Sequence, residues 1–386
     1  MTQKENLKAW EKLVESQLKT SNIYEILGAT KDGVALKPYL TENAGEISSL
    51  PMVEESSQLV ANYSDGLEED VFAFLLDKNI EGLEDKALYI NDKSLAGHIL
   101  TEQNRVFSLV GLMDINTGEL DIQLAKELLA KQYERSLTID LSTYQNGGAS
   151  IIQQLAYGIS IAKEIVEELG ETALHDIIFK IAIGSNYFME IAKIRALKLL
   201  FVALCKEYNV EVKVPYIFAE TTLRNKTNFD KENNLIRSTL ELASGMVGGA
   251  DALYSNNYAL ENSTPLSEEI SFKQQIILAY ESILNVFTDA SNGSYYVEDI
   301  TQQLCEKAWD LFLGIEDEGG IIKLTQEGKI QKEVFASATK EHEELLNGNI
   351  SLIGANLYPK LEVKKSLDEL YTPKEIKPVR LSEVYE

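Results

Sequence analysis

The amino-acid sequence predicts an α/β fold, a (β/α)8 barrel of TIM type with an N-terminal helical and extended arm and extra C-terminal helices. Two observations lead to this prediction. From about residue 66 to residue 286, short apolar runs typical of strands alternate with segments of helical periodicity, and this order favours a parallel sheet with helical crossovers. In addition, 386 residues exceed the roughly 250 that one barrel takes. Periodicity alone leaves an open doubly wound sheet as the alternative.

The elements follow in chain order from apolar spacing and turn residues. An amphipathic helix is predicted over residues 4–19, where Leu7, Trp10 and Leu13 recur at helical spacing, and an extended segment with Asp32-Gly33 comes next. Further helices are predicted over residues 66–79, 94–103, 121–132, 150–169, 187–208, 233–246 and 272–286. Strands are predicted over residues 87–90, 106–112, 136–141, 177–183, 211–219 and 251–255.

The helix over residues 150–169 has the clearest pattern. Ile151, Leu155 and Ile159 begin an apolar stripe of period 3.6, Ser150 is the predicted N-cap, and Gly170 ends the helix. After residue 297 the sequence is mainly helical to residue 346, with one more strand predicted at 351–354.

Three regions are predicted: an N-terminal arm and lead-in segment over 1–65, the barrel over 66–363, and a C-terminal tail or linker over 364–386. The last region holds Pro373 and Pro378 among charged residues, which favours an extended chain.

The charge of the chain excludes several kinds of partner. Lys plus Arg number 36 and Asp plus Glu 61, so the formal net charge of −25 disfavours nucleic acid and anionic membrane surfaces. No apolar stretch approaches the roughly 20 residues of a membrane span, and no signal peptide is recognised at the start, so a cytoplasmic protein is expected. Cys205 and Cys305 are expected to be reduced core residues.

One short motif has a specific counterpart. Residues 139–150 read Ile-Asp-Leu-Ser-Thr-Tyr-Gln-Asn-Gly-Gly-Ala-Ser. This segment resembles the strand-to-helix corner of the adenosylcobalamin-dependent acyl-CoA mutases, the methylmalonyl-CoA mutase family, whose catalytic members read Gly-Tyr-His-Met-Gln-Glu-Ala-Gly-Ala. Matching Gln145, Gly148 and Ala149 places Ser142 at the tyrosine and Thr143 at the catalytic histidine. The resemblance therefore implies degenerate site positions at Ser142, Thr143 and Gln145.

Four later segments, over residues 182–195, 219–237, 248–253 and 289–298, resemble the same family in order and spacing. In the first of them, Asn186 lies at the predicted carboxyl end of a strand, where barrel enzymes place functional residues. Asn186 is therefore the candidate substrate-binding residue. For Lys193 and Arg195, a solvated face or an ion pair is favoured over a site for the phosphates of CoA.

Other family features are missing. The chain has no Tyr-Pro-Thr-Met-Tyr segment, and none of His98, His175 and His342 lies in the Asp-x-His-x-x-Gly context that supplies the cobalt ligand in the family's cobalamin domain. His98 and His175 are interpreted as ordinary polar positions near element ends, and His342 as an exposed helix residue. The resemblance thus implies a barrel without a cobalamin domain, which binds no cofactor or metal itself.

The resemblance implies a function for such a barrel: the small, non-catalytic subunit of a heterodimeric methylmalonyl-CoA mutase. Adenosylcobalamin and the substrates methylmalonyl-CoA and succinyl-CoA would then bind to a homologous large subunit. The helix around Trp10 and Leu13 is a candidate partner contact, and packing on its own barrel is the alternative. Two other functions stay open, a catalytic acyl-CoA mutase barrel that acts with a separate cobalamin-binding chain and an acyl-CoA-binding accessory protein.

Overall fold

The computed structural model describes residues 3–23, 32–37, 40, 50, 52–63, 71–78, 80, 82–95, 104–211 and 214–386 of the chain. Within these residues, eight parallel strands form one sheet in the order β4-β3-β2-β1-β8-β7-β6-β5. The strands are β1 (Gln58–Asn62), β2 (Ala73–Leu76), β3 (Ala87–Ile90), β4 (Arg105–Ser108), β5 (Leu137–Asp140), β6 (Ile177–Ile183), β7 (Tyr216–Thr221) and β8 (Ala252–Tyr254).

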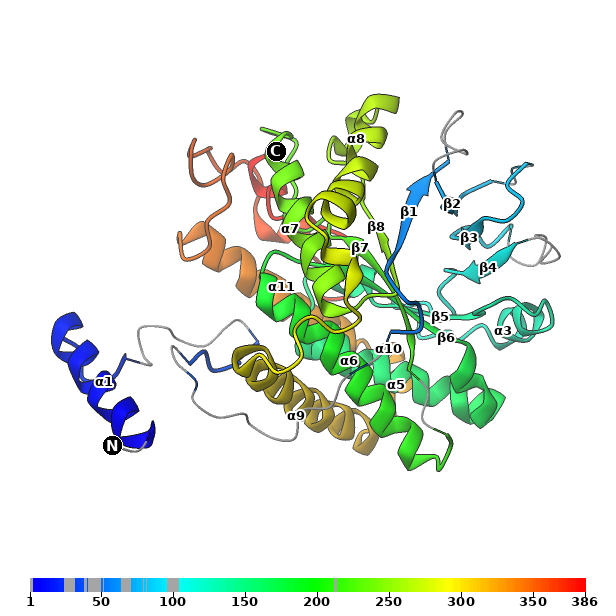
Figure 1. Ribbon diagram of the computed structural model, residues 1–386, viewed down its shortest axis with the longest axis horizontal. Helices are drawn as coiled ribbons and strands as arrows, with labels where there is room; N and C mark the ends of the chain where they lie inside the picture. Colours follow the sequence, from blue (N-terminus) through cyan, green and yellow to red (C-terminus); the bar gives the residue numbers. More distant parts are fainter. Residues whose placement is uncertain are drawn as a thin grey trace.

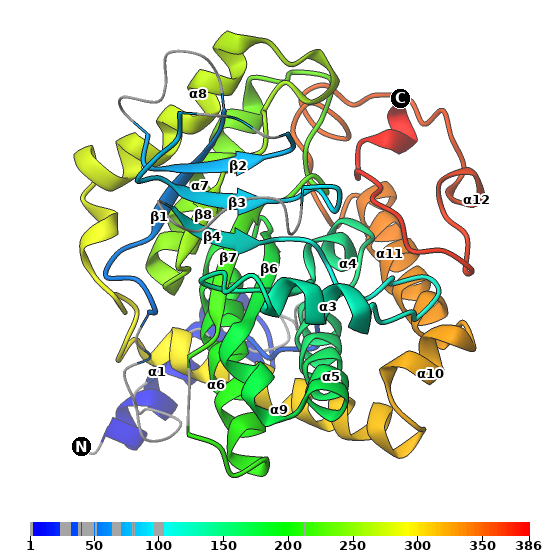
Figure 2. The ribbon, with the colours of Figure 1, turned by 90° about the vertical axis from the view of Figure 1, so that its right-hand side faces the viewer.

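The sheet curls until its two edges meet. β1 pairs with β8 in parallel, and two parallel bridges, Phe107↔Arg135 and Gly111↔Thr138, join the ends of β4 and β5. The amide of Ser108 donates to the carbonyl of Arg135 at 3.0 Å across this junction. The predicted (β/α)8 barrel is therefore confirmed (Figures 1 and 2).

The helices are distributed unevenly around the barrel. Those of the described residues are α1 (Gln3–Leu18), α3 (Ile122–Leu129), α4 (Ser142–Asn146), α5 (Ile151–Leu169), α6 (Tyr187–Glu207), α7 (Asn233–Gly248), α8 (Pro265–Ile276), α9 (Tyr295–Asp317), α10 (Ile321–Gln326), α11 (Lys329–Leu346) and α12 (Leu367–Leu370). The described residues between β1 and β4 contain no helix, whereas α5, α6 and α9 form a packed group beside β5 and β6. In Figure 2, β2, β3 and β4 face the viewer with no helix drawn in front of them.

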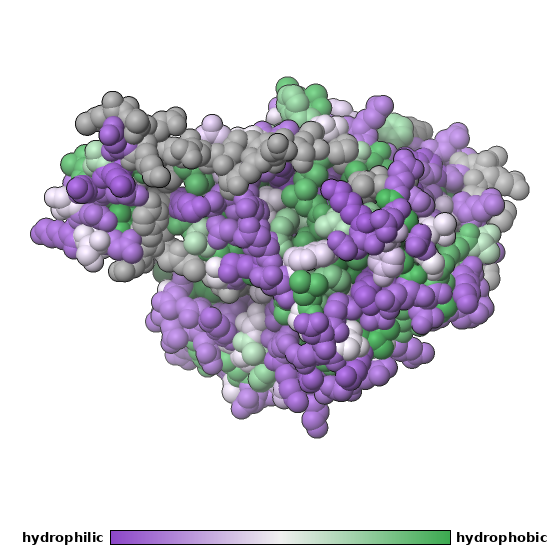
Figure 3. Space-filling view, turned by 90° about the horizontal axis from the view of Figure 1, so that it is seen from below, coloured by the Kyte–Doolittle hydropathy of each residue, from purple (hydrophilic) through white to green (hydrophobic). Residues whose placement is uncertain are grey.

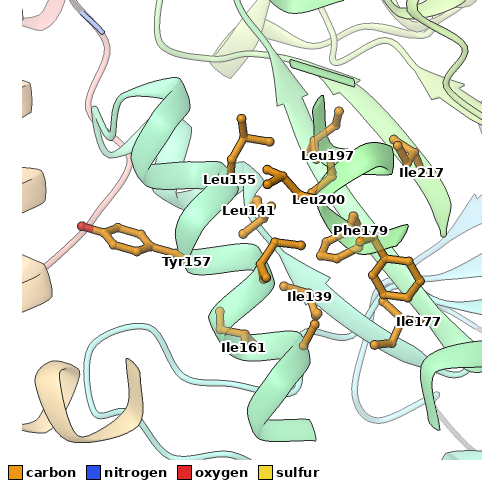
Figure 4. Packing of buried hydrophobic residues seen from close by; sticks show 14 of the residues in the cluster. Ile139, Leu141, Leu155, Tyr157, Ile161, Ile177, Phe179, Leu197, Leu200 and Ile217 are labelled. Carbon is orange, nitrogen blue, oxygen red and sulfur yellow. The ribbon is translucent and has the colours of Figure 1, made fainter. Parts of the chain in front are cut away.

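The most strongly patterned segments formed as the sequence predicts, for local reasons. α5 begins at a capping box, in which the Ser150 side chain accepts from the amide of Gln153 and the Gln153 side chain accepts from the amide of Ser150, and it ends at Gly170. β6 is buried along its whole length, as a strand covered on both faces should be. Side chains such as Phe179 pack outward against α5 and α6 to form the largest core (Figure 4).

Several predicted boundaries and elements were wrong. The helix predicted over 66–79 is contradicted by β2, and the strand predicted over 211–219 begins only at Tyr216. The helix predicted over 272–286 ends as α8 at Ile276, continues as a π-helix, η3 (Ile277–Glu281), and then becomes irregular. The predicted strand at 351–354 is a single bridge between Ile353 and Leu357. Most of the helix predicted over 94–103, and His98 with it, lies outside the described residues.

The C-terminal segment, residues 364–386, has little regular structure, but it is folded onto the barrel. Its apolar side chains form a cluster with α11 that includes Tyr371, Leu381 and Val384, all at most 8% exposed. The amide of Val379 donates to the carbonyl of Asn146 at 3.0 Å, and that of Leu381 to the carbonyl of Arg224 at 2.8 Å. The expected extended tail is therefore a packed covering of the barrel end at which α4 lies.

The barrel interior is filled by aromatic side chains. The rings of Tyr89 and Phe107 stack with centroids 4.7 Å apart, Phe107 and Tyr216 lie 4.8 Å apart, and Phe218 lies 5.1 Å from Tyr89. The hydroxyls of Tyr89 and Tyr216 share a hydrogen bond of 2.6 Å. These rings belong to one buried cluster, so the barrel centre is a packed core.

Hydrophilic residues cover most of the face in Figure 3, and hydrophobic residues gather near its middle. None of the described helices is long and apolar enough to cross a membrane. Neither Cys205 nor Cys305 is in a disulfide; Cys205 is buried, as predicted for a core residue, and Cys305 is partly buried.

Candidate functional site

A cavity of about 470 Å³ lies at the carboxyl ends of β5, β6 and β7, where barrel proteins place their sites. Four parts of the chain enclose it: the N-terminal arm, the β5–α5 corner, the turns after β6 and β7, and the covering formed by α11 and the C-terminal residues. The lining residues are Asp32, Leu36, Gln145, Ala149, Ile151, Gln154, Gly184, Ser185, Asn186, Met189, Glu190, Thr222, Arg224, Asn225, Glu341, Ile350 and Leu381.

The structure brings two of the four predicted site residues into this cavity and leaves two outside its lining. Gln145 and Asn186, which follow the neighbouring strands β5 and β6, both line it. Ser142 and Thr143 do not, although they lie in the same short helix, α4. The Ser142 hydroxyl is instead buried and donates to Asp140 Oδ1 at 2.6 Å. Thr143, the position matched to the catalytic histidine, is not among the residues that line the cavity.

A buried lysine fixes the floor of the cavity. Lys193 Nζ donates to Gln145 Oε1 at 2.7 Å and to the carbonyl of Ala182 at 2.6 Å, and it forms an ion pair with Glu190 at 2.5 Å. Gln154 also accepts from it, at 3.4 Å. Because Lys193 is 1% exposed, these partners hold it rigidly and fix the carbonyl oxygen of the Gln145 amide.

The ion-pair prediction for Lys193 and Arg195 is confirmed, and a solvated face is excluded because both side chains are buried. Arg195 pairs with Asp289 and, at 2.6 Å, with Glu298, which ties α6 to the start of α9. The family-like Asp289–Glu298 segment therefore has a structural partner. The sequence did not identify Glu190 or Gln154 as site residues. The available signals were the spacing of three residues between Glu190 and Lys193 on one helix and of four residues between Ser150 and Gln154 on another.

Arg224 links the cavity to its covering. Its Nη1 donates to the Tyr371 hydroxyl at 2.6 Å and to the carbonyl of Val379 at 2.7 Å, and its Nε donates to Glu341 at 3.0 Å. Burial disfavours the charged guanidinium, but Glu341 and Tyr371 outweigh this effect and raise the pKa of Arg224. One cation thus holds three elements of the covering in place, which sequence reasoning did not foresee.

His342 takes part in the same covering, so its prediction as an exposed residue was wrong. Its Nδ1 shares a hydrogen bond of 2.6 Å with the Tyr371 hydroxyl, and its Nε2 lies 3.2 Å from the carbonyl of Leu381. Burial, with a smaller contribution from the Arg224 charge, lowers the pKa of His342 from 6.5 to about 4. The tail packs over the face of α11 that the helical pattern alone could not assign to the interior.

His342 should make the folded state sensitive to mild acid. Because its folded-state pKa is depressed, the unfolded chain binds more protons between pH 6.5 and pH 4, and stability falls as the pH drops through this window. Its contribution approaches a slope of about 1.4 kcal/mol per pH unit. We expect His342→Gln, measured by urea unfolding from pH 7 to pH 4, to flatten the slope by that amount. An equal slope in wild type and His342→Gln would contradict the assignment.

Lys180, on β6, lies inside the barrel beside two carboxylates. Lys180 Nζ is 3.3 Å from Asp140 Oδ2 and 3.8 Å from Glu220 Oε2. Burial opposes the lysine charge, but the two carboxylates outweigh it and raise the pKa of Lys180. The amine therefore stays protonated and cannot serve as a nucleophile or base at neutral pH.

The comparisons with known proteins agree with the motifs. The family described as Methylmalonyl-CoA mutase matches residues 122–385, which is more than half of the chain. The chain belongs to the methylmalonyl-CoA mutase family. The matched range includes β5 to β8 and every part of the cavity except the contribution of the N-terminal arm.

Individual relatives within the methylmalonyl-CoA mutase family show moderate identity. The chain is 33% identical over 237 residues to the methylmalonyl-CoA mutase small subunit of Porphyromonas gingivalis, covering 58% of this chain and 38% of that protein. It is 30% identical over 257 residues to the methylmalonyl-CoA mutase of Rhizobium meliloti, covering 63% and 36%. It is 28% identical over 243 residues to the 2-hydroxyisobutanoyl-CoA mutase large subunit of Aquincola tertiaricarbonis, covering 59% and 43%. The chain thus spans less than half the length of these relatives.

The described histidines do not fit the cobalt of the family cofactor. A ligating histidine needs a free ring nitrogen, whereas both nitrogens of the buried His342 face other groups. His175 lies in a 3-10 helix, η1 (Glu171–Asp176), directly before the amino end of β6 and therefore opposite the cavity. Among the residues that the structure describes, no group of three or more His, Cys, Asp or Glu could hold a metal ion. No step through cobalamin is therefore assigned to this chain.

Proposed function

We propose that the chain is the small, non-catalytic subunit of a heterodimeric, adenosylcobalamin-dependent methylmalonyl-CoA mutase, which interconverts succinyl-CoA and methylmalonyl-CoA. The single observation that carries this proposal is the position of Thr143. It replaces the catalytic histidine of the resemblance, and it does not line the cavity. A hydroxyl there cannot become cationic, so it would be a weak substitute for imidazole even if it reached a substrate.

The barrel interior supports the same function. In the family reaction the cofactor supplies the radical chemistry, and the protein has to orient the substrate and exclude water. Here the aromatic cluster around Tyr89 and Phe107 occupies the barrel centre, and Lys180 is neutralised by Asp140 and Glu220. In the part of the chain that the structure describes, these contacts stabilise the barrel and commit the Lys180 charge to two carboxylates, so that it is not free for the thioester of a substrate.

The proposed partner is a homologous large mutase subunit that holds adenosylcobalamin and the acyl-CoA. The names of the Porphyromonas gingivalis and mycobacterial relatives, each a small subunit, support such a partner. The helix α1 lies outside the barrel in Figures 1 and 2, and its Leu13 is 57% exposed. Its apolar side chains, including Trp10, remain a proposed contact to that partner. The proposal places the complex in the cytoplasm and in propionate metabolism.

The cavity supports an alternative in which this chain itself binds a small ligand. Its volume of about 470 Å³ is in the range of small-molecule pockets, and Gln145, Asn186 and Arg224 provide polar groups on its wall. This cavity is the observation that keeps open an acyl-CoA-binding accessory protein or a catalytic barrel that acts with a separate cobalamin-binding chain.

The test is co-expression with the large mutase subunit of the same organism. We expect a one-to-one complex by light scattering, mutase activity that requires the large chain and adenosylcobalamin, and no activity of this chain alone. Turnover by this chain with a cobalamin-binding chain, or failure of the two subunits to associate, would contradict the proposal. Thermal stabilisation of the isolated chain by CoA esters, lost in Asn186→Ala, would instead favour the ligand-binding function.

A further inference from the structure

An exposed apolar patch lies at the amino-terminal end of the barrel, opposite the cavity. It consists of Phe72, before β2, and of five residues after α8: Ile277, Tyr280, Ile283, Val286 and Phe287. Phe72 and Tyr280 are 71% and 73% exposed, and the other four are between 47% and 62% exposed. Figure 1 shows the segment after α8, drawn in yellow, on the outside of the barrel.

Two residues of the patch border a groove. Phe72 and Tyr280 both line a hollow of about 370 Å³ whose walls also include Leu59, Phe272 and Ile276. α8 is tied to α7, because Gln274 Nε2 donates to the carbonyl of Leu235 and to Thr239 Oγ1. The exposed side chains of Ile236 and Leu240 lie on that part of α7.

The backbone is strained where it presents the patch. The regular helix gives way to the π-helix η3, and Ile283 then has φ 55° and ψ 33°, a left-handed conformation that is unfavourable for a β-branched residue. This conformation leaves Ile283 58% exposed. Such strain is typical of functional surfaces, because the fold alone gains nothing from an exposed isoleucine there.

The size of the patch matches a stable interface. Its side chains, with those of Ile236 and Leu240, expose on the order of 1,000 Å², more than the largest patch of a typical monomer and about what one partner buries in a standard interface. None of these residues is charged, whereas the groove beside them is also lined by Asp85, Arg105 and Lys86, whose Nζ lies 4.9 Å from the centroid of the Phe72 ring. A second copy of this chain is a poor occupant, because each copy carries a net charge of −25 and the two would repel.

We propose that this patch is the docking surface for the homologous large mutase subunit, with an apolar side chain of that subunit seated in the groove between Phe72 and Tyr280. This inference rests on the proposed function and adds the contact face to it. Buried aromatic anchors in a central pocket dominate the affinity of protein interfaces, so the groove is expected to contribute most of the binding.

The test measures binding between the purified chain and the large subunit by biolayer interferometry. Tyr280→Glu and Phe72→Glu should each raise the Kd roughly 30-fold or more. Leu313→Glu, which replaces an exposed leucine of α9 outside the patch, should change it less than about threefold. Thermal unfolding of each variant checks its fold. Hydroxyl-radical footprinting of the wild-type complex requires no variant and should show protection of Tyr280 and Phe287.

The outcomes separate this inference from the proposed function. A wild-type complex whose affinity and footprint are indifferent to the patch would overturn the docking surface and leave the small-subunit function intact. Failure of the wild-type chains to bind would overturn both. A homodimer of this chain that Tyr280→Glu dissociates would overturn the heterologous partner and assign the patch to a second copy.

Discussion

Replacing Lys226 with methionine is expected to lower the free energy of unfolding by about 3–5 kcal/mol, because it leaves a buried carboxylate without its cation. Lys226 Nζ donates to both oxygens of Glu241 at 2.7 Å, and both side chains are 1% exposed. Asn225 Nδ2 donates to the same carboxylate at 2.6 Å. The pair joins the turn after β7 to α7 and thereby supports the cavity wall at Asn225.

Urea unfolding of three variants measures the effect. Lys226→Met should unfold at much lower urea, and the double variant Lys226→Met/Glu241→Gln should recover part of the loss because no buried charge remains. Lys329→Met, which removes an ion pair to Glu318 that is about half exposed, should be indistinguishable from wild type. Equal midpoints for Lys226→Met and Lys329→Met would contradict the buried-pair account.

The same variant should show a pH dependence of known sign. Burial raises the pKa of Glu241 above its ordinary value of 4.5, and Lys226 opposes that rise. Without Lys226 the folded state binds this proton more tightly than the unfolded chain, so stability is lost as the pH rises above 4.5. The destabilisation of Lys226→Met should therefore be smaller at pH 5 than at pH 8.

The second large effect is expected at Gly148, in the motif that carries the resemblance. Gly148 has φ 98°, and a Cβ there would lie 2.5 Å from Ala338 Cβ and 2.9 Å from Arg224 Nη2. Alanine would add backbone strain to overpacking between the turn after α4 and α11, so Gly148→Ala should lower the unfolding free energy by about 3 kcal/mol or more. Glycine is required at position 148 because α11, which is part of the covering of the cavity, approaches the β5–α5 corner closely.

Gly170→Ala separates the two contributions to this effect. Gly170 also has a positive φ, 87°, but a Cβ there would meet no atom within 4 Å. That variant should therefore show strain alone, about 1–2 kcal/mol. Urea unfolding compares the two variants directly. If Gly148→Ala lowers the unfolding free energy no more than Gly170→Ala does, α11 would have to shift around the added methyl group without any loss of stability.

Strong local patterns made part of the fold predictable from sequence. The apolar period of α5, with Ser150 as its cap, and the continuous apolar run of β6 specify these elements through neighbours in the chain. The segment around Phe74 is predicted as a helix instead, because a short apolar run fits both periods. Parallel pairing of β2 with β1 and β3, which is a tertiary contact, makes it a strand.

The candidate site was predictable in the same limited way. Gln145 and Asn186 follow adjacent strands, and parallel topology alone brings them to one end of the barrel. The sequence could not show that α4 turns Ser142 toward Asp140, because the direction of a side chain depends on how a one-turn helix sits on its neighbours. Glu341 and Leu381 entered the site from more than a hundred residues away through the folded C-terminal segment.

By itself, the sequence determined the alternation of strands and helices, the ends of the best-patterned elements, and the family motifs, because these depend on residues close together in the chain. Only the tertiary structure decided that residues 364–386 cover the barrel, that His342 is buried beneath them, and that aromatic rings fill the barrel centre. The physical reason is that burial and pKa depend on the surfaces that meet. Periodicity marks a face as apolar, but it cannot show which distant segment covers that face.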